Sequence, residues 1–258
     1  LTLGTALMGL LSIAKTVPNS IGNLTVILGS VFTPHYTILY AKKKIPELIT
    51  EAKFSAKIVS FILSVPIAGF IAFGRQFYVL WQPTKSPEEI TMIQIMSVLT
   101  CITFLCASQT QSLMMINTVC NKLRLPVFVN LAIGIASVVI AIAACNFTDY
   151  GVYFVAGTSS VLMGLRALIF TPAYSAYILK QKLSTFFPTV IRDCVGFIII
   201  LVLFSIVSNF VTVTGWGSFI IICAICGILA YALSLPLLFN RAELGKLKNK
   251  LTKRLKRS

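Results

Sequence analysis

A long apolar segment from Lys15 to Lys44 ends abruptly at three consecutive lysines, which is typical of a membrane crossing that stops at a wet surface. On a helical wheel at about 100° per residue, its polar residues fall within one narrow sector. A membrane helix keeps polar side chains only where they meet protein, water or ligand, so we expect this polar face to look inward. The sector contains Lys15, Asn19, Gly22, Asn23, Ser30, Thr33 and Thr37.

Two prolines bracket this segment. We expect Pro18 to lie in the first turn of the helix, where a missing N–H is tolerated. Pro34 lies near the other end and removes the hydrogen bond to the carbonyl of Ser30, so it should bend the helix. The segment therefore predicts a crossing that ends near Ala41 and bends close to Pro34.

Composition places the whole chain in the same class. It is 57% hydrophobic and 11% charged, with a mean hydropathy of +0.91, far more apolar than a soluble core of this size requires. We predict an all-α polytopic membrane helix bundle over residues 1–239, followed by a basic tail over 240–258. Runs near the roughly 20 residues that a crossing needs predict about seven spans. They are the opening helix to residue 41, then 55–80, 90–121, 126–145, 151–178, 188–210 and 216–239.

Positive charge alternates between the loops. Of the 22 lysines and arginines, 18 flank the loops after the first, third and fifth spans or lie in the tail. By the positive-inside rule, these loops and the C-terminus are cytoplasmic. The net charge of +15 points to orientation and to anionic membrane lipids, not to nucleic acid. The chain opens at Leu1 inside an apolar run without signal-peptide features, so we expect it to begin partway through a longer protein.

The tail has two interpretations. Leu244, Leu247, Leu251 and Leu255 recur at helical spacing among lysines and arginines, which favours an amphipathic helix on the anionic inner leaflet. A disordered basic tail that only enforces topology explains the same residues. The sequence leaves both interpretations open.

Catalytic and metal-binding motifs are not evident. The seven cysteines lie mostly in apolar spans, and the CxxC of Cys223 and Cys226 has no third ligand nearby. His35 is the single histidine and stands without a carboxylate or cysteine partner. The seven acidic residues are predicted in loops or at span ends. We therefore expect no enzyme activity, no metal and no cofactor, and any carboxylate for ion coupling should lie in another part of the protein.

Arg166 places a positive charge inside the membrane. It lies near the middle of the 151–178 span, too deep to reach either surface easily, so it needs a partner. Ser159 and Tyr174 lie on its helical face, and these semi-polar surroundings favour a substrate-binding role. The alternative is an arginine satisfied by a neighbouring helix or by backbone carbonyls at the break expected near Pro172.

Further candidate binding residues lie on the first and third spans. Lys15 opens the polar face that carries Asn19 and Asn23, and it can face a cavity or reach lipid headgroups. Gln94 and Gln109 lie on a polar face of the third span. They can bind sugar hydroxyls or form hydrogen bonds with a neighbouring helix.

Six segments spread along the chain carry a family resemblance: LSIAKTVPN, GSVFTPHYTILYAKKK, VPIAGFIAFGRQFYVLW, NKLRLPVFVNLAIGIASVVIAIA, YGVYFVAG and RALIFTPAYSAY. In this order they resemble bacterial polysaccharide exporters of the lipid-linked oligosaccharide flippase type, within the multidrug/oligosaccharidyl-lipid/polysaccharide exporter superfamily. The resemblance implies two helical lobes around a central cavity. This chain is similar to most of the second lobe plus two additional helices, with the N-terminal lobe of the same protein missing.

The resemblance implies transport without covalent chemistry. Such proteins flip an undecaprenyl-diphosphate-linked oligosaccharide from the cytoplasmic to the outer leaflet of the bacterial plasma (inner) membrane, by alternating access, for cell-surface polysaccharide or lipopolysaccharide biosynthesis. It implies that Arg166 and Lys15 meet the diphosphate, that Pro34 and Pro172 are flexible points, and that a polysaccharide polymerase and glycosyltransferases are partners.

Two other functions are open. A multidrug extruder of the same superfamily has a similar architecture, although organic cations suit an acidic cavity and the embedded charges here are basic. A non-transporting membrane scaffold for polysaccharide assembly would use the basic inner face to recruit glycosyltransferases.

Overall fold

The computed structural model describes residues 4–148, 150–239 and 243–245. Within these ranges the chain is all-helical and has no strand. Seven helical stretches are long and apolar enough to cross a membrane, which confirms the predicted fold class. The helices are α1 (Thr5–Ser30), α2 (Thr33–Ala41), α3 (Ile45–Trp81), α4 (Pro87–Ser108), α5 (Gln111–Val119), α6 (Arg124–Phe147), α7 (Gly151–Leu165), α8 (Thr171–Ile178), α9 (Phe187–Phe210) and α10 (Trp216–Leu238).

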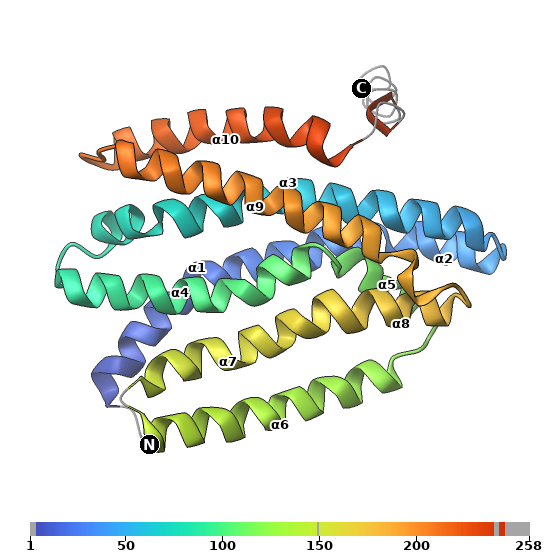
Figure 1. Ribbon diagram of the computed structural model, residues 1–258, viewed down its shortest axis with the longest axis horizontal. Helices are drawn as coiled ribbons and strands as arrows, with labels where there is room; N and C mark the ends of the chain where they lie inside the picture. Colours follow the sequence, from blue (N-terminus) through green and yellow to red (C-terminus); the bar gives the residue numbers. More distant parts are fainter. Residues whose placement is uncertain (1–3, 149, 240–242, 246–258) are drawn as a thin grey trace.

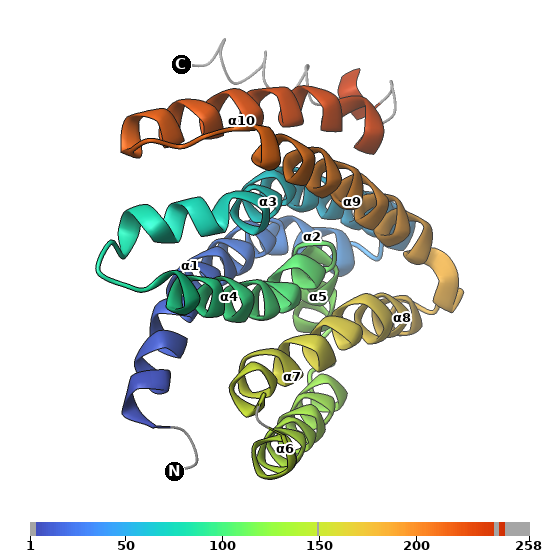
Figure 2. The ribbon, with the colours of Figure 1, turned by 60° about the vertical axis from the view of Figure 1, so that its left-hand side comes forward.

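The helices stack with α9 and α10 at one end of the bundle and α6 and α7 at the other (Figures 1 and 2). Helix α3 lies between these ends and packs against α9, α4 and α10, while α4 packs against α1 and α7. Large apolar side chains remain exposed on the end helices, such as Ile228 at 70% and Phe128 at 67%. Such surfaces suit hydrocarbon and not water, as expected for lipid-facing helices.

Three of the spans are broken, and the breaks lie at similar distances from the ends of their spans. Helix α1 gives way to α2, α4 to α5, and α7 to α8 through a short π-helix. Helices α2, α5 and α8 have 9, 9 and 8 residues, so each break lies about 12–14 Å from the end of its span. Helix α5 contacts both α2 and α8. The three short helices share a buried core that includes Tyr36, Leu39, Leu113, Ile116, Ala176 and Leu179.

Proline explains two of these breaks. Pro34 lies in the first turn of α2, which confirms the predicted bend, and Pro172 lies in the first turn of α8. The prediction of one continuous 90–121 span is wrong, because the helix is interrupted at Gln109 and Thr110 without a proline or glycine. Pro18 does not lie in a first turn, because α1 already begins at Thr5 and encloses it.

Glycine lets α1 approach α4 closely. A Cβ atom at Gly22 would overlap the ring of Phe104 in α4. We therefore expect Gly22→Leu to destabilise the protein by about 1–3 kcal/mol through overpacking. Gly134→Leu is the matched control, because a Cβ at Gly134 meets nothing within 4 Å. The measurement is the thermal unfolding midpoint in detergent, and equal midpoints for the two variants would contradict this α1–α4 contact.

The predicted tail over 240–258 lies almost entirely outside the described residues, so the amphipathic helix stays a prediction. Of this tail, the structure describes Glu243, Leu244 and Gly245. Leu244 packs near Phe54 of α3 and Leu238 of α10. Glu243 and Leu244 therefore lie against the surface of α3.

Candidate functional site

Arg166 begins a five-residue π-helix, Arg166–Phe170, near the middle of the Gly151–Ile178 span. Pro172 accounts for this wider turn, because it has no N–H for the carbonyl of Leu168 and its ring crowds the preceding turn. The N–H of Thr171 bonds instead to the carbonyl of Arg166, five residues back. The turn thereby keeps this part of the backbone hydrogen-bonded at a depth where lipid offers no partner.

The guanidinium of Arg166 is only partly satisfied. Its Nε and Nη2 atoms are buried and have no hydrogen-bond acceptor among the described residues. Its Cζ atom lies 5.9 Å from the ring centroid of Phe170, within cation–π range. The predicted alternative, in which carbonyls near Pro172 satisfy the arginine, is therefore not seen at these two nitrogens. Because guanidinium donors match the planar oxygens of carboxylate and phosphate, the group can accept an anion here.

Tyr174 belongs to a stack of aromatic rings that extends from Arg166 along α8. The ring centroids of Phe170 and Tyr174 lie 5.1 Å apart, and those of Tyr174 and Tyr177 lie 6.3 Å apart. The Tyr174 hydroxyl donates to the carbonyl oxygen of Lys122 at 3.2 Å. Phe170 thus links Arg166 to Tyr174, so these two predicted residues lie in one neighbourhood.

Within the described chain only part of the predicted polar face of α1 is buried, and its inward orientation stays a prediction. Lys15 is half-buried, whereas Asn19 and Asn23 are exposed. Gly22, which belongs to the same predicted face, is buried and permits close packing against α4, as Gly29 does against α5. Because polar side chains are costly in lipid, the exposed face must meet water, ligand or protein beyond the described chain.

The two predicted glutamines form contacts between helices. Gln94 is half-buried and its Nε2 donates to the carbonyl of Ile71 in α3 at 3.0 Å, while its Oε1 has no donor within the described ranges. Gln109 is 1% exposed and lies at the α4–α5 break. Its Oε1 accepts from Ser60 Oγ at 2.6 Å and its Nε2 donates to Ser108 Oγ at 2.9 Å. Both ends of the Gln109 amide therefore bond within the protein.

A buried charge cluster joins α3, α9 and the segment after α10. Lys57 is buried, and its Nζ donates to both carboxylate oxygens of Glu243, at 2.7 and 2.9 Å. Asp193 is fully buried within electrostatic range of Lys57 and Arg192. Both oxygens of Asp193 have no hydrogen-bond donor in the described part of the chain. The expectation that every acid lies in a loop or at a span end is therefore wrong for Asp193, which faces the α3 interface two turns into α9.

This cluster had a weak signal in the sequence. Lys57 and Asp193 each lie inside a predicted span or directly beside one, and a charge so placed usually has a partner. The identity of the partners was not readable, because Lys57 and Glu243 are 186 residues apart. No group of three or more potential metal-ligating side chains occurs in residues 4–148, 150–239 and 243–245.

Comparison with known proteins finds a distant relative, the "uncharacterized membrane protein EpsK" of Bacillus subtilis (strain 168). It is 22% identical over 222 residues, which are 85% of this chain and 43% of the relative. The chain thus spans less than half the length of this relative. No protein-family model and no solved structure matches the chain. Together with the seven apolar helices, this similarity identifies the chain as a multi-pass helical membrane protein.

Proposed function

We propose that this chain is part of a transporter that flips a polyprenyl-diphosphate-linked oligosaccharide from the cytoplasmic to the outer leaflet of a bacterial plasma membrane. The observation that carries this proposal is the unsatisfied guanidinium of Arg166 near mid-membrane. A diphosphate that crosses the membrane needs a cation and hydrogen-bond donors at this depth. The exposed polar face of α1, which includes Asn19 and Asn23, offers a wet surface for the attached glycan.

The helix breaks supply a way to alternate between two conformations. Helices α2, α5 and α8 share one buried core and each follows a break in its span. They share this core with Leu48 of α3 and Val190 of α9, so this end of the bundle can move as a unit, with bending at Pro34, Thr110 and Pro172. Transport by such rocking needs no covalent step.

The multidrug extruder has less support. An extruder of organic cations needs an acid that its substrate can reach, but Asp193 is fully buried beside Lys57 and Arg192. The unsatisfied mid-membrane charge, Arg166, is basic and attracts anions. The proposal therefore takes a lipid diphosphate as the substrate class.

Reconstitution of the full-length protein in liposomes tests the function directly. We expect it to speed the crossing of a fluorescent polyprenyl-diphosphate oligosaccharide at least tenfold over protein-free liposomes, read as the fraction that a membrane-impermeant quencher reaches. Ethidium, an organic cation, should not be moved. Transport of ethidium alone would establish the extruder, and transport of neither compound would favour the scaffold.

A further inference from the structure

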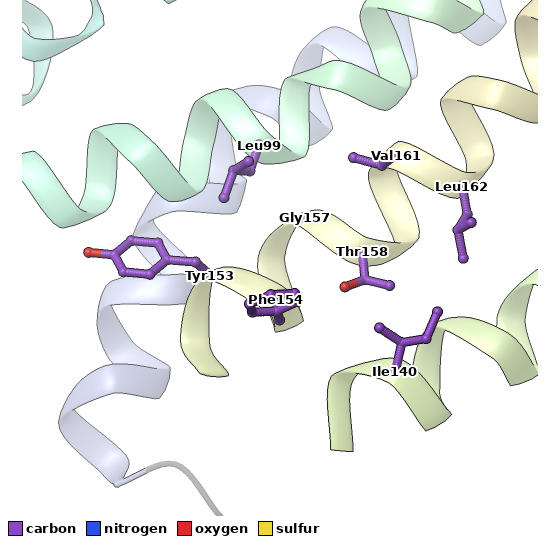
Figure 3. Close-up of a pocket in the computed structure, with 8 residues that line it drawn as sticks. All are labelled: Leu99, Ile140, Tyr153, Phe154, Gly157, Thr158, Val161 and Leu162. Atoms are coloured by element: carbon purple, nitrogen blue, oxygen red, sulfur yellow. The ribbon is translucent and has the colours of Figure 1, made fainter. Parts of the chain in front are cut away.

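None of the described residues that line the apolar groove on α7 carries a charge. The groove encloses about 380 Å³ between α6 and α7, with Leu99 of α4 as its floor (Figure 3). Thr158 supplies one hydroxyl to the lining, whereas the Tyr153 hydroxyl points away from the groove in Figure 3. The buried charges of the bundle therefore lie apart from this groove. Its lining residues are Leu99, Ile140, Tyr153, Phe154, Gly157, Thr158, Val161 and Leu162.

Asp193 is a buried acid for which the described contacts provide no hydrogen-bond donor. Helix α9 begins at Phe187, so Asp193 lies six residues, or about 9 Å, into the helix. The residue is fully buried, and neither of its carboxylate oxygens meets a donor in the described part of the chain. A carboxylate anion without donors is costly to bury, and such a group gains a proton instead. The arrangement seen here therefore suits an Asp193 that carries a proton.

The two cations within electrostatic range of Asp193 are bonded to other groups. The Nζ atom of Lys57 donates to both carboxylate oxygens of Glu243, at 2.7 and 2.9 Å. The Nε atom of Arg192 donates to the carbonyl oxygen of Leu237 at 2.8 Å. Leu237 belongs to the last turn of α10, and Glu243 follows that helix. Lys57 and Arg192 thus tie the end of α10 and the segment after it to α3 and α9.

The surroundings of Asp193 make both of its charge states accessible. Burial favours the bound proton, and the two nearby cations favour its release. Helices α8 and α10, which also pack against α9, contain no charged side chain. Thiols are mostly uncharged at neutral pH, so the cysteines nearby leave this balance unchanged. The titratable and charged groups in this neighbourhood are Lys57 from α3, Arg192 and Cys194 from α9, Cys106 from α4 and Glu243.

We propose that Asp193 is a proton-binding site, and that its proton determines whether Lys57 holds Glu243. When the proton is bound, Asp193 is neutral and Lys57 bonds to Glu243, as in this structure. When the proton passes to water, the new carboxylate anion competes with Glu243 for the Lys57 ammonium, because an uncompensated buried charge is costly. The Lys57–Glu243 pair then weakens, and the residues around Glu243 separate from α3. This switch acts on the segment after α10 and does not depend on the proposed function.

Infrared difference spectroscopy of the full-length protein tests the proton site. A protonated carboxyl group has a C=O stretching band that disappears when the proton leaves. We expect such a band to be lost between about pH 5.5 and about pH 8.5, a range in which ordinary carboxyl groups are already ionised. The band should be absent from Asp193→Asn. Spectra in which the wild type and Asp193→Asn lose the same bands would overturn the proposal.

A fluorine label at Leu244 reports whether the segment is docked. Leu244 packs near the ring of Phe54, so trifluoromethyl-phenylalanine at position 244 lies against that ring when docked and meets water when released. We expect the docked fluorine NMR signal to fall at least threefold between about pH 5.5 and about pH 8.5, and to stay constant when Asp193→Asn is added. The same label at Phe147, which is 86% exposed, is the control and should not change. A pH-independent signal at position 244, or an unchanged transition with Asp193→Asn, would overturn the switch.

Glu243→Gln tests the competition for Lys57 from the other side. Glutamine removes the competing carboxylate, so the Lys57 ammonium becomes available to the Asp193 anion. We expect the Asp193 band to be lost at a pH at least about one unit lower than in the wild type, which is a tenfold easier release of the proton. Because Glu243 lies outside α9, this variant also decides the matter if Asp193→Asn does not fold. A band that is lost at the same pH as in the wild type, or at a higher one, would overturn the proposal.

Discussion

Replacement of Arg166 with alanine is expected to reduce export of the lipid-linked oligosaccharide about tenfold to hundredfold. The reason is the loss of charge-assisted hydrogen bonds of about 1.5–3 kcal/mol to the diphosphate, at a depth where water cannot replace them. The measurement is surface glycan in a flippase-deletion strain complemented with the full-length protein, together with the amount of lipid-linked precursor retained in the cells. Surface glycan should fall and precursor should accumulate.

Arg166→Lys separates charge from geometry. Lysine keeps the positive charge but lacks the planar fork that binds two oxygens at once, so we expect export between the levels of wild type and Arg166→Ala. Arg75→Ala is the matched control, because Arg75 is an exposed arginine near the end of α3, and its export should stay within about twofold of wild type. All variants are compared at equal amounts in the membrane. Normal export by Arg166→Ala would reduce Arg166 to a packing role.

Replacement of Lys57 with methionine is expected to destabilise the protein by about 3–5 kcal/mol. Lys57 bonds to both oxygens of Glu243 and lies near the fully buried Asp193. Without the Lys57 ammonium, the carboxylates of Glu243 and Asp193 lose a neighbouring positive charge. Removing one partner of a buried ion pair leaves the other charge uncompensated, which is costly. The measurement is the free energy of unfolding in denaturant titrations of the detergent-solubilised protein.

Two comparisons isolate the buried charge. Lys44→Met removes an exposed ion pair with Glu47, in which the side chains are 50% and 56% exposed, and should cost less than about 1 kcal/mol. Adding Asp193→Asn to Lys57→Met should recover part of the loss, because it removes a buried negative charge along with the cation. If Lys57→Met and Lys44→Met lose the same stability, the buried cluster makes no special contribution.

Several structural features followed from local properties of the chain. The bend at Pro34 and the break before Pro172 were readable, because proline removes a backbone donor wherever it occurs. The depth of Arg166 in the membrane could be predicted from its position within an apolar run. The break at Thr110 was not readable, because neither proline nor glycine marks it and the bond from Ser60 of α3 to Gln109 is a tertiary contact.

Contacts between distant residues limited the prediction of the site. Gln94 and Gln109 were recognised as polar residues of one span, but only packing shows that they bond to α3. The polar face of α1 was recognised as well, yet only packing shows that Gly22 lies against Phe104 while Asn19 and Asn23 stay exposed.

The sequence by itself determined the membrane class, the all-helical fold and the charged residue at mid-depth, because these depend on hydropathy and on order along the chain. Only the tertiary structure decided which charges are neighbours and which are unsatisfied. Lys57 and Glu243 meet across 186 residues, while two nitrogens of Arg166 meet no acceptor in the described chain. The physical reason is that helix positions follow from hydrogen bonds within each segment, whereas partners across helices follow from the fit of side chains during packing.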